Sequence, residues 1–246
     1  MNNPNPVSTL RENLYPVVLQ IITFLLFVTG TTTYSRALAE VNIIDQDLTY
    51  TASYGKRNAG SIQIQIRGTD TGYIVTSITK PHKLAGLLLK EHTTEAEFAW
   101  RNEELVPISA TESLKGKERY DRGFMFDYDN LTVSLSEGRS STFEQNDQFE
   151  SVTFPLLLMH RDLAEIENLE IKEVSAKRLR DYTYQKAEQE TVKVPAGEFS
   201  TWKVTRFRSD RPEDTVVTWL NQSDNPIPVK IAINKDGNTS TLALQK

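Results

Sequence analysis

Cysteine is absent from this chain of 246 residues, and histidine occurs only three times. Without cysteine the chain has no disulfide bond, no thiolate metal site, no cysteine nucleophile and no cysteine to carry an N-terminal lipid. Basic blocks are also absent, because 28 lysine and arginine residues are interspersed among 33 acidic ones, for a net charge of −5. This pattern argues against a nucleic-acid partner and against electrostatic adhesion to an anionic membrane, but it leaves apolar contact with lipid open.

Long apolar runs are scarce, and the most prominent is "VVLQIITFLLFV" at positions 17–28. A helix of this length is too short to cross a bilayer comfortably. Downstream, Ala37 and Ala39 give the small-x-small pattern of a signal-peptidase site. We therefore predict a signal peptide over residues 1–39, cut after Ala39, with no stable transmembrane span in the mature chain. The alternative is an uncleaved N-terminal anchor, and in both cases the globular part lies outside the cytosol.

Alternation of apolar and polar residues dominates the chain from Leu48 onward. In "SIQIQIR", Ile62, Ile64 and Ile66 share one face, which predicts a half-buried strand, and "GYIVTSIT" after a turn completes a hairpin. Further strands are predicted at "TEAEFAWR", "LVPISAT", "YDRGFMFDYD", "LTVSLSE", "RDYTYQKA", "STWKVTRF", "TVVTWL", "VKIAIN" and "TSTLALQ". Residues 40–246 contain no repeat and no low-complexity linker, so we expect a single domain.

Two stretches interrupt the alternation. "KPHKLAGLLLKEH" concentrates leucine and predicts a short helix or an apolar loop between strands. "NDQFESVTFPLLLMHRDLAEIENL" has apolar residues at helical spacing, with Asp147 as an N-cap and Pro155 as a kink or restart. The predicted fold class is therefore mainly β: one strongly curved antiparallel sheet, or an open or closed β-barrel, with one or two short inserted helices.

The stretch "VPAGEFSTWKVTR" begins with a predicted hairpin corner. Pro195 and Gly197 occupy the second and fourth positions that a type I turn favours, and strand-like sequence lies on both sides. The register is open, because a slip of one residue exchanges the faces of Phe199 and Trp202. Trp202 is therefore a candidate for either a core or a pocket.

Several landmarks occur together in order: "YGKRNAGS" (54–61), "FMFDYDN" (124–130), "NDQFES" (146–151), "VPAGEFSTWKVTR" (194–206) and "TWLNQSDNPIPVKIAI" (218–233). Over residues 45–246 the chain resembles the DUF3108 family of exported bacterial proteins. The resemblance implies a periplasmic cell-envelope β protein, with a lipocalin-like or lipoprotein-carrier-like fold. It brings no established catalytic residues, and the motif residues Gly197, Trp219, Pro228 and Val229 have the character of a scaffold signature.

The sequence offers little for catalysis or metal binding. His82, His92 and His160 are dispersed, and the acidic residues around His92 lack ligand spacing, so we predict solvated surface there and neither a metal nor a cofactor. No serine lies in a nucleophile motif. Asp127 and Asp129 alternate on a predicted strand, where a polar strand edge ending in a turn is favoured over an acid and base pair.

Large apolar side chains of the predicted strands and insertions are candidates to line an interior or a lid. They are Leu84, Leu87, Leu88, Phe98, Trp100, Phe124, Phe126, Leu157, Trp202 and Trp219. A curved sheet of this size either fills with side chains or keeps room for one apolar ligand, and the sequence leaves both interpretations open.

Three functional hypotheses follow. The first is a non-enzymatic periplasmic protein that binds a lipid or another amphiphile in a curved sheet. The second is a scaffold or protein-interaction module of the envelope, with a solid barrel and an envelope protein as its partner. The weakest is an enzyme acting on envelope polysaccharide or lipid, which rests only on the two aspartates.

Overall fold

The computed structural model describes residues 45–82, 91–114, 121–151, 154–185 and 187–245. Contacts between Cα atoms divide the chain into Met1–Glu40 and Val41–Lys246, and the described residues all belong to the second unit. Within the described residues, no helix has both the length and the apolar character needed to cross a bilayer. The predicted signal peptide and the leucine-rich segment 83–90 lie outside the described residues.

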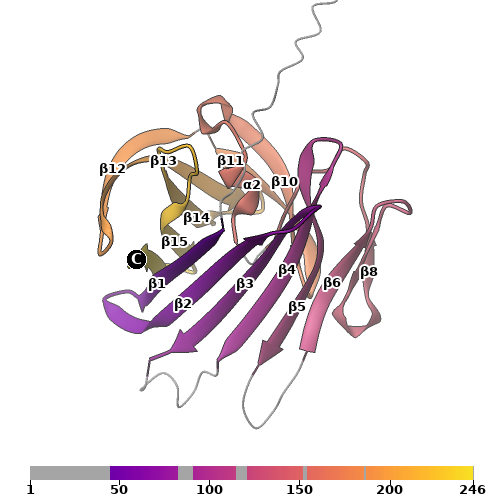
Figure 1. Cartoon of the computed structure of the whole chain (residues 1–246), viewed down its shortest axis with the longest axis horizontal. Coiled ribbons are helices and arrows are strands. Elements are labelled where there is room, and N and C mark those ends of the chain that lie inside the picture. Colours follow the sequence, from indigo (N-terminus) through magenta and orange to yellow (C-terminus); the bar gives the residue numbers. More distant parts are fainter. Residues whose placement is uncertain (1–44, 83–90, 115–120, 152–153, 186, 246) are drawn as a thin grey trace, which may run out of the picture. The chain divides into compact units, whose positions relative to one another are not determined.

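The described residues form strands almost throughout (Figure 1). The strands are β1 (Gln46–Tyr54), β2 (Arg57–Gly68), β3 (Gly72–Pro81), β4 (His92–Arg101), β5 (Glu104–Leu114), β6 (Asp121–Asp127), β7 (Thr132–Leu135), β8 (Ser140–Thr142), β9 (Phe149–Ser151), β10 (Asn168–Ser175), β11 (Arg178–Gln185), β12 (Glu188–Val194), β13 (Gly197–Arg208), β14 (Arg211–Asn221), β15 (Pro228–Lys235) and β16 (Asn238–Leu244). Between them lie the 3₁₀ turns η2 (Ser136–Gly138) and η3 (Leu163–Glu165) and the helix α2 (Leu156–Met159).

All these strands belong to one sheet, in the order β8-β7-β6-β5-β4-β3-β2-β1-β16-β15-β14-β13-β11-β10-β9, with β12 paired to β13. Pairing is antiparallel except between β9 and β10. The centre of the sheet is the pair formed by β1 and β16, the first and last strands. The prediction of a mainly β fold with one large curved sheet is confirmed, and the sheet is unclosed, because no ladder joins β8 to β9 among the described residues.

The β2–β3 hairpin shows why the alternating sequence forms this sheet. Ile66 of β2 pairs with Val75 of β3, and both side chains are buried, while Gln65 is exposed. Burying a side chain of this size contributes about 1.5–3 kcal/mol. At the other end of β2, Gly60 has φ +150, and a Cβ there would lie 2.3 Å from the Lys80 carbonyl oxygen. The close approach of the two strands therefore requires glycine.

The two ends of the sheet meet through side-chain packing. Strand β9 lies against β5, and β10 lies against β6. The Phe149 ring on β9 is 4.8 Å from the Phe126 ring on β6 and 5.1 Å from Phe143, with ring planes steeply inclined. One backbone hydrogen bond, from Ser136 N–H to the Ala176 carbonyl (3.0 Å), also crosses the junction. We call this junction the aromatic seam, and it takes the place of the missing ladder.

Helix α2 is shorter than the predicted one and begins later. It starts immediately after Pro155, as a restart at proline predicts, and all four of its residues are buried. The expected N-cap at Asp147 is wrong, because the Asp147 carboxylate accepts from the Glu144 N–H (2.7 Å) in a local turn. Residues 149–151 then form β9, because pairing with β10 and burial on the sheet override the helical spacing.

The stretch 194–197 is the predicted hairpin corner, which is confirmed by the pairing of Val194 with Gly197. Strand β12 approaches β15, and the Ala196 N–H donates to the Leu244 carbonyl (3.0 Å). On this side Trp219 is buried, and its indole N–H donates to Glu190 (3.1 Å). The residues that carry the family resemblance therefore lie in turns and strand contacts, as predicted for a scaffold signature.

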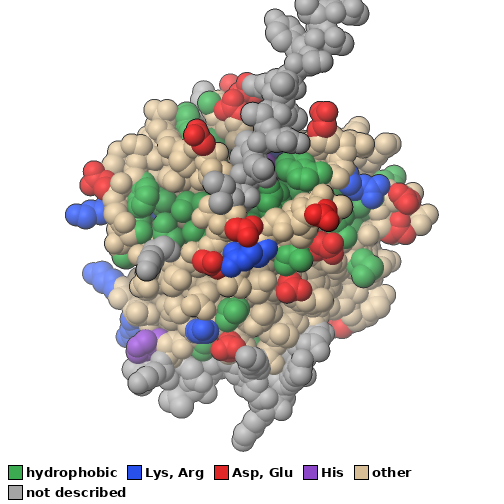
Figure 2. All heavy atoms as spheres, viewed as in Figure 1, with side chains coloured by type: hydrophobic (Ala, Val, Ile, Leu, Met, Phe, Trp, Pro, Cys, Tyr) green, Lys and Arg blue, Asp and Glu red, His purple; other side chains and the backbone are tan. Residues whose placement is uncertain are grey.

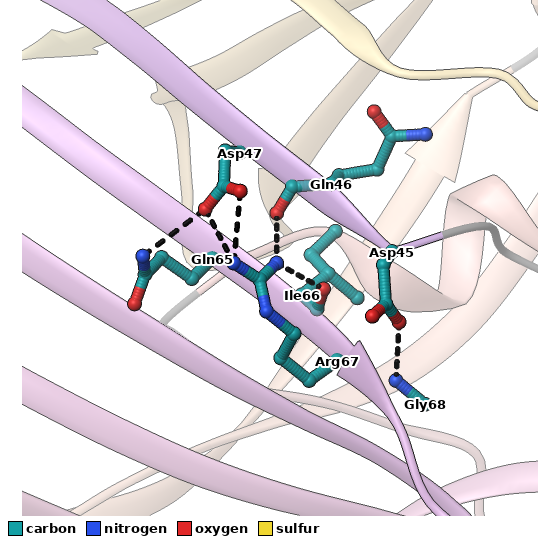
Figure 3. A network of polar contacts seen from close by, with 7 residues as sticks. All are labelled: Asp45, Gln46, Asp47, Gln65, Ile66, Arg67 and Gly68. Carbon is teal, nitrogen blue, oxygen red and sulfur yellow. Dashed lines mark hydrogen bonds and ion pairs between the residues drawn. The ribbon is translucent and has the colours of Figure 1, made fainter.

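The start of β1 is fixed on the outside of the sheet by a polar network (Figure 3). Arg67 donates through Nη2 to both carboxylate oxygens of Asp47 (2.7 and 2.8 Å) and through Nη1 to the Gln46 carbonyl (2.9 Å). Asp45 accepts from the Gly68 N–H (2.9 Å). The arginine holds the pKa of Asp47 below its usual range. This exposed network pins the first described strand to β2.

Candidate functional site

The sheet has an inner face, which we define as the face that carries Ile66 and Val75. Paired residues share a face, and so do residues two apart along a strand. Following the pairs across the sheet places Phe98 and Phe124 on the inner face, near one end of the strands. The same rule extends the inner face through β1 and β16. Helix α2 is buried in the same hydrophobic core. One end of the inner face is therefore filled by aromatic side chains and by α2.

At the other end of the inner face, apolar side chains remain exposed. Val216 pairs with Ile233, Ile233 with Ser240, and Ser240 with Tyr54, so these residues form one row across β14, β15, β16 and β1. Tyr54 is 53% exposed and Ile233 is 39% exposed. Val216 is half-buried. We call this row of residues the apolar row. It lies at the end of the inner face where β1 ends, which is also the end where β3 and β5 end.

The predicted site residues are distributed over several environments. Four are buried in the core: Phe98, Phe124, Phe126 and Leu157. Trp202 is half-buried against the core, whereas Trp219 is buried on the opposite face, under β12. Trp100 is 41% exposed and lies edge-on against His160, at 5.1 Å between ring centroids. Leu84, Leu87 and Leu88 lie outside the described residues.

A group of ionisable side chains is buried between β9, β10, β11 and β13. Glu150 pairs with Glu173 in the parallel ladder, and Tyr184 pairs with Arg206. The Arg206 Nη1 lies 2.6 Å from Glu173 Oε2, and its guanidinium lies 4.5 Å from the centre of the Tyr182 ring. Charges rarely enter a core unless they are paired, and here two carboxylates share one arginine. We call these five residues the buried ionic group.

Burial decides the protonation of the buried ionic group. It raises the pKa of Glu150 well above its usual value, and the nearby Arg206 and two backbone hydrogen bonds oppose this only in part. These bonds come from the Leu157 N–H (3.0 Å) and the Ser151 N–H (3.2 Å). Burial alone would lower the pKa of Arg206, but Glu173 and the tyrosines outweigh it and raise that pKa. Glu150 thus connects the buried ionic group to the start of α2.

His160 lies at the other end of α2, between Tyr73 and Trp100. Its backbone N–H donates to the Leu157 carbonyl (3.2 Å) and caps the helix. Burial lowers the pKa of His160 to about 4. Neither ring nitrogen has a hydrogen-bond partner within the described part of the chain. The neutral imidazole therefore packs as an aromatic ring.

The geometry removes the support for an enzymatic hypothesis based on Asp127 and Asp129. Both carboxylates are exposed where β6 ends, and Asp127 accepts from the Asn130 N–H (3.0 Å) and its side-chain amide (2.8 Å) in a turn. Asp129 lies 3.4 Å from Arg101. His92 lies 3.9 Å from Glu112, and no cluster of three potential metal ligands occurs among residues 45–245 that are described. The arrangement at Asp127 is the polar strand end that the sequence favoured.

The surface carries mixed charge. Figure 2 shows acidic and basic side chains interspersed over the face in view, with hydrophobic side chains in small groups between them. The buried ionic group, by contrast, was not predicted from the sequence. Its signal is a charged residue at an inward position of an alternating strand: Glu173 follows Leu169 and Ile171, and Arg206 follows Trp202 and Val204 at intervals of two. These two departures have opposite charge, and the ion pair that they form spans the intervening strand β11.

Comparison with known proteins gives one family and a fold likeness. The family model "Protein of unknown function (DUF3108)" matches residues 49–244. A beta-barrel-like protein of the domain of unknown function DUF1849 from Brucella abortus aligns with a TM-score of 0.51 at 11% identity, over 82% of this chain and 96% of that one. A candidate lipoprotein from Parabacteroides distasonis aligns with a TM-score of 0.37 at 11% identity, over 81% and 93%. No curated protein matches the chain by sequence. The first alignment supports a barrel-like fold.

Proposed function

The chain belongs to the DUF3108 family, and we propose that it is a non-enzymatic protein of the periplasm that binds a lipid or another amphiphile on the inner face of its curved sheet. The observation that carries this proposal is the apolar row. Tyr54 and Ile233 expose large apolar side chains on the face that elsewhere forms the core. Exposed apolar surface continuous with a core is typical of a ligand-binding surface.

The closed end of the inner face supports the same function. Aromatic side chains and α2 fill that end, so an apolar chain would reach the apolar row from the other end only. Half-buried Ile62 and Leu242 pack against the core next to the apolar row and extend its apolar surface inward. Binding of this kind needs no nucleophile, no metal and no cofactor.

The test is native mass spectrometry of the full chain, purified gently from an export-competent bacterial host, followed by extraction of any bound molecule. We expect a stoichiometric amphiphile on the wild-type protein. Ile233→Asp is expected to lower its occupancy at least tenfold, because it places a charge in the apolar row. Met125→Asp is the matched control: Met125 is 63% exposed but lies on the outer face, so occupancy should not change.

A clean apo mass, also after incubation with envelope lipid extract, would contradict amphiphile binding. The same spectra test export: a mature chain starting at Glu40 is expected if the signal peptide is cut after Ala39. A chain that retains residues 1–39 in the membrane fraction would instead support an uncleaved anchor.

A scaffold module is the second candidate, and the outer edge of β12 favours it. Strand β12 pairs only with β13, so its other edge is unpaired among the described residues. A partner segment can add to such an edge by backbone hydrogen bonding. Crosslinking in intact cells would identify one dominant partner under this hypothesis, and Thr191→Pro on β12 would abolish that crosslink while Ile233→Asp would not.

A further inference from the structure

Four arginines lie at the same end of the inner face as the apolar row, and we call them the arginine cluster. Arg178 and Arg180 alternate along β11, and Arg206 pairs with Tyr184 on the same face. Arg208 follows Arg206 on β13, after a bulge. Partial burial is the main cause that lowers the pKa of Arg178, and the positive charges of Arg180 and Arg208 add to it, whereas Tyr182 and Glu173 act in the opposite direction.

Only two of the four arginines are compensated by carboxylates. Arg206 forms an ion pair with Glu173 (2.6 Å), and Arg208 forms one with Asp210. Arg178 and Arg180 form no ion pair with any carboxylate of the described residues. Glu173 lies opposite Arg180 in the β10–β11 ladder, but its carboxylate pairs with Arg206.

Other acidic groups nearby do not supply the missing charge. Asp181 lies between Arg180 and Tyr182 in sequence, but it points to the other face, where it bonds to Lys172 (2.7 Å). Glu150 is held toward its neutral form by burial. Lys177, in the turn before β11, adds a further positive charge. The arginine cluster therefore carries two positive charges in excess.

The arginine cluster borders the apolar row. Arg206 on β13 pairs with Val216 on β14, and Val216 pairs with Ile233 on β15. One transverse line of residues thus runs from a guanidinium group through Val216 and Ile233 toward Tyr54. A molecule lying along this line meets positive charge at one end and, along the rest, side chains that are apolar apart from the small Ser240. This is the complement of an amphiphile with an anionic head group.

We propose that the arginine cluster binds the phosphate head group of an acyl-chain lipid whose chain lies over the apolar row. The proposal rests on the proposed function and adds the chemical class of the ligand. A phosphate monoester carries about −1.5 to −2 charges at neutral pH, which matches the two uncompensated arginines, whereas a carboxylate carries one. Guanidinium groups bind phosphate oxygens in pairs, and arginine cannot lose its charge at the pH of the cell.

The test compares single-chain lipids of one chain length on the full-length protein, freed of bound lipid and used below the critical micelle concentration. The probes are an acyl glycerol phosphate, the corresponding phosphocholine lipid, the fatty acid and inorganic phosphate, each titrated by calorimetry. We expect the phosphate lipid to bind at least tenfold more tightly than the phosphocholine lipid and the fatty acid. Inorganic phosphate should bind weakly, because it lacks contact with the apolar row.

The variants isolate the head-group contact. Arg178→Gln/Arg180→Gln is expected to remove the tenfold preference and leave binding of the phosphocholine lipid unchanged. Arg101→Gln/Arg139→Gln is the charge-matched control, because both arginines are exposed and each pairs with a carboxylate, Asp129 and Glu137 respectively. It should keep the preference. Circular dichroism and the thermal midpoint confirm that each variant is folded.

Three results would overturn the proposal. Equal affinity for the phosphate and phosphocholine lipids would show that the protein does not distinguish their head groups. If Ile233→Asp still weakened the binding of both lipids, the proposed amphiphile binding would remain supported. A preference that survives Arg178→Gln/Arg180→Gln would place the head group elsewhere. Inorganic phosphate that binds as tightly as the phosphate lipid would make this a site for free phosphate. If no lipid binds at all, the proposed function fails with it.

Discussion

The two halves of the inner face follow the same register rule but carry different chemistry. In the half built from β2 to β6, the most deeply buried inward positions are apolar, as at Ile66 and Val75. Charged inward residues of this half, such as Glu112, lie toward the strand ends and remain partly exposed. In the half built from β9 to β13, inward positions include Glu173 and Arg206. Buried ion pairs are often less stabilising than well-packed apolar residues of similar size. The difference teaches that packing alone does not account for the second half, where the sheet keeps charge at a cost in stability.

Removing one partner of the buried ion pair should have the largest effect. Arg206→Ala removes the ion-pair partner of the buried Glu173, so we expect the free energy of unfolding at pH 7 to fall by about 3–5 kcal/mol. Urea denaturation measures it. The double variant Glu173→Leu/Arg206→Met should recover most of the loss, because it removes both charges. If Arg206→Ala left the free energy of unfolding unchanged within error, the buried charge would not distinguish the half β9–β13 from the half β2–β6.

The two ends of α2 should give opposite pH dependences. The folded-state pKa of His160 is depressed from 6.5 to about 4, so its contribution to stability is present above pH 6.5 and is lost as the pH falls toward 4. For Glu150 the folded-state pKa is raised, so its contribution is present below pH 4.5 and is lost as the pH rises through the folded-state value.

Variants separate these two contributions in urea denaturation at a series of pH values. His160→Phe should abolish a loss of about 2–3 kcal/mol between pH 6.5 and 4. Glu150→Gln should abolish the opposite loss at higher pH, because the amide keeps a neutral side chain at the start of α2. If His160→Phe leaves the acid side of the profile unchanged, then His160 is not held neutral by burial.

A smaller effect is expected on the outer face, where Trp219 packs under β12. Trp219→Phe removes the hydrogen bond from the indole N–H to Glu190, and we expect a loss of about 1 kcal/mol in the free energy of unfolding. Glu190 remains solvated in the variant, so no buried charge results. The measurement is urea denaturation, with Glu190→Gln as the control. A loss as large as that of Arg206→Ala would mean that the buried ion pair contributes no more to stability than this hydrogen bond.

The smallest effect is expected at the exposed network of β1 and β2. Asp47→Asn should leave the urea midpoint unchanged within error, because ion pairs in water contribute little and are screened by salt. Midpoints at low and high salt test this, with Gln65→Ala as the control for the neighbouring amide. A salt-dependent loss of stability would show that this network fixes β1 more firmly than an exposed pair can.

The sequence predicted the apolar half of the fold well, because alternation is a direct signal there. The β2–β3 hairpin and the corner at 194–197 occur where their patterns indicate them. The segment around β9 was predicted as helix, because its apolar spacing fits a helix and its pairing with β10 is a contact made far along the chain. Local periodicity carries no information about such a partner.

The candidate site was predicted only in part, for a related reason. Phe98 and Phe124 were recognised as interior, but Trp219 lies on the other face and Trp100 is at the rim. The buried ionic group depends on strands β9, β10, β11 and β13 meeting in space, which no local pattern reports. Glu173 alone, at an inward position of an alternating strand, suggests that the strand has been assigned to the wrong face. Only the ion pair with Arg206 explains its position.

The pairing of β1 with β16 has a consequence for how the chain folds. Tyr50 lies opposite Leu244, so the middle of the sheet forms only when the two most distant strands of the domain find each other. Closing such a long loop is entropically costly, and folds rich in distant contacts form slowly. Strands β1 to β8 can pair with one another before β16 is available, but the two flanks join only through β16. The free edge of β1 therefore stays open to chaperones and proteases until the final strand of the emerging polypeptide arrives.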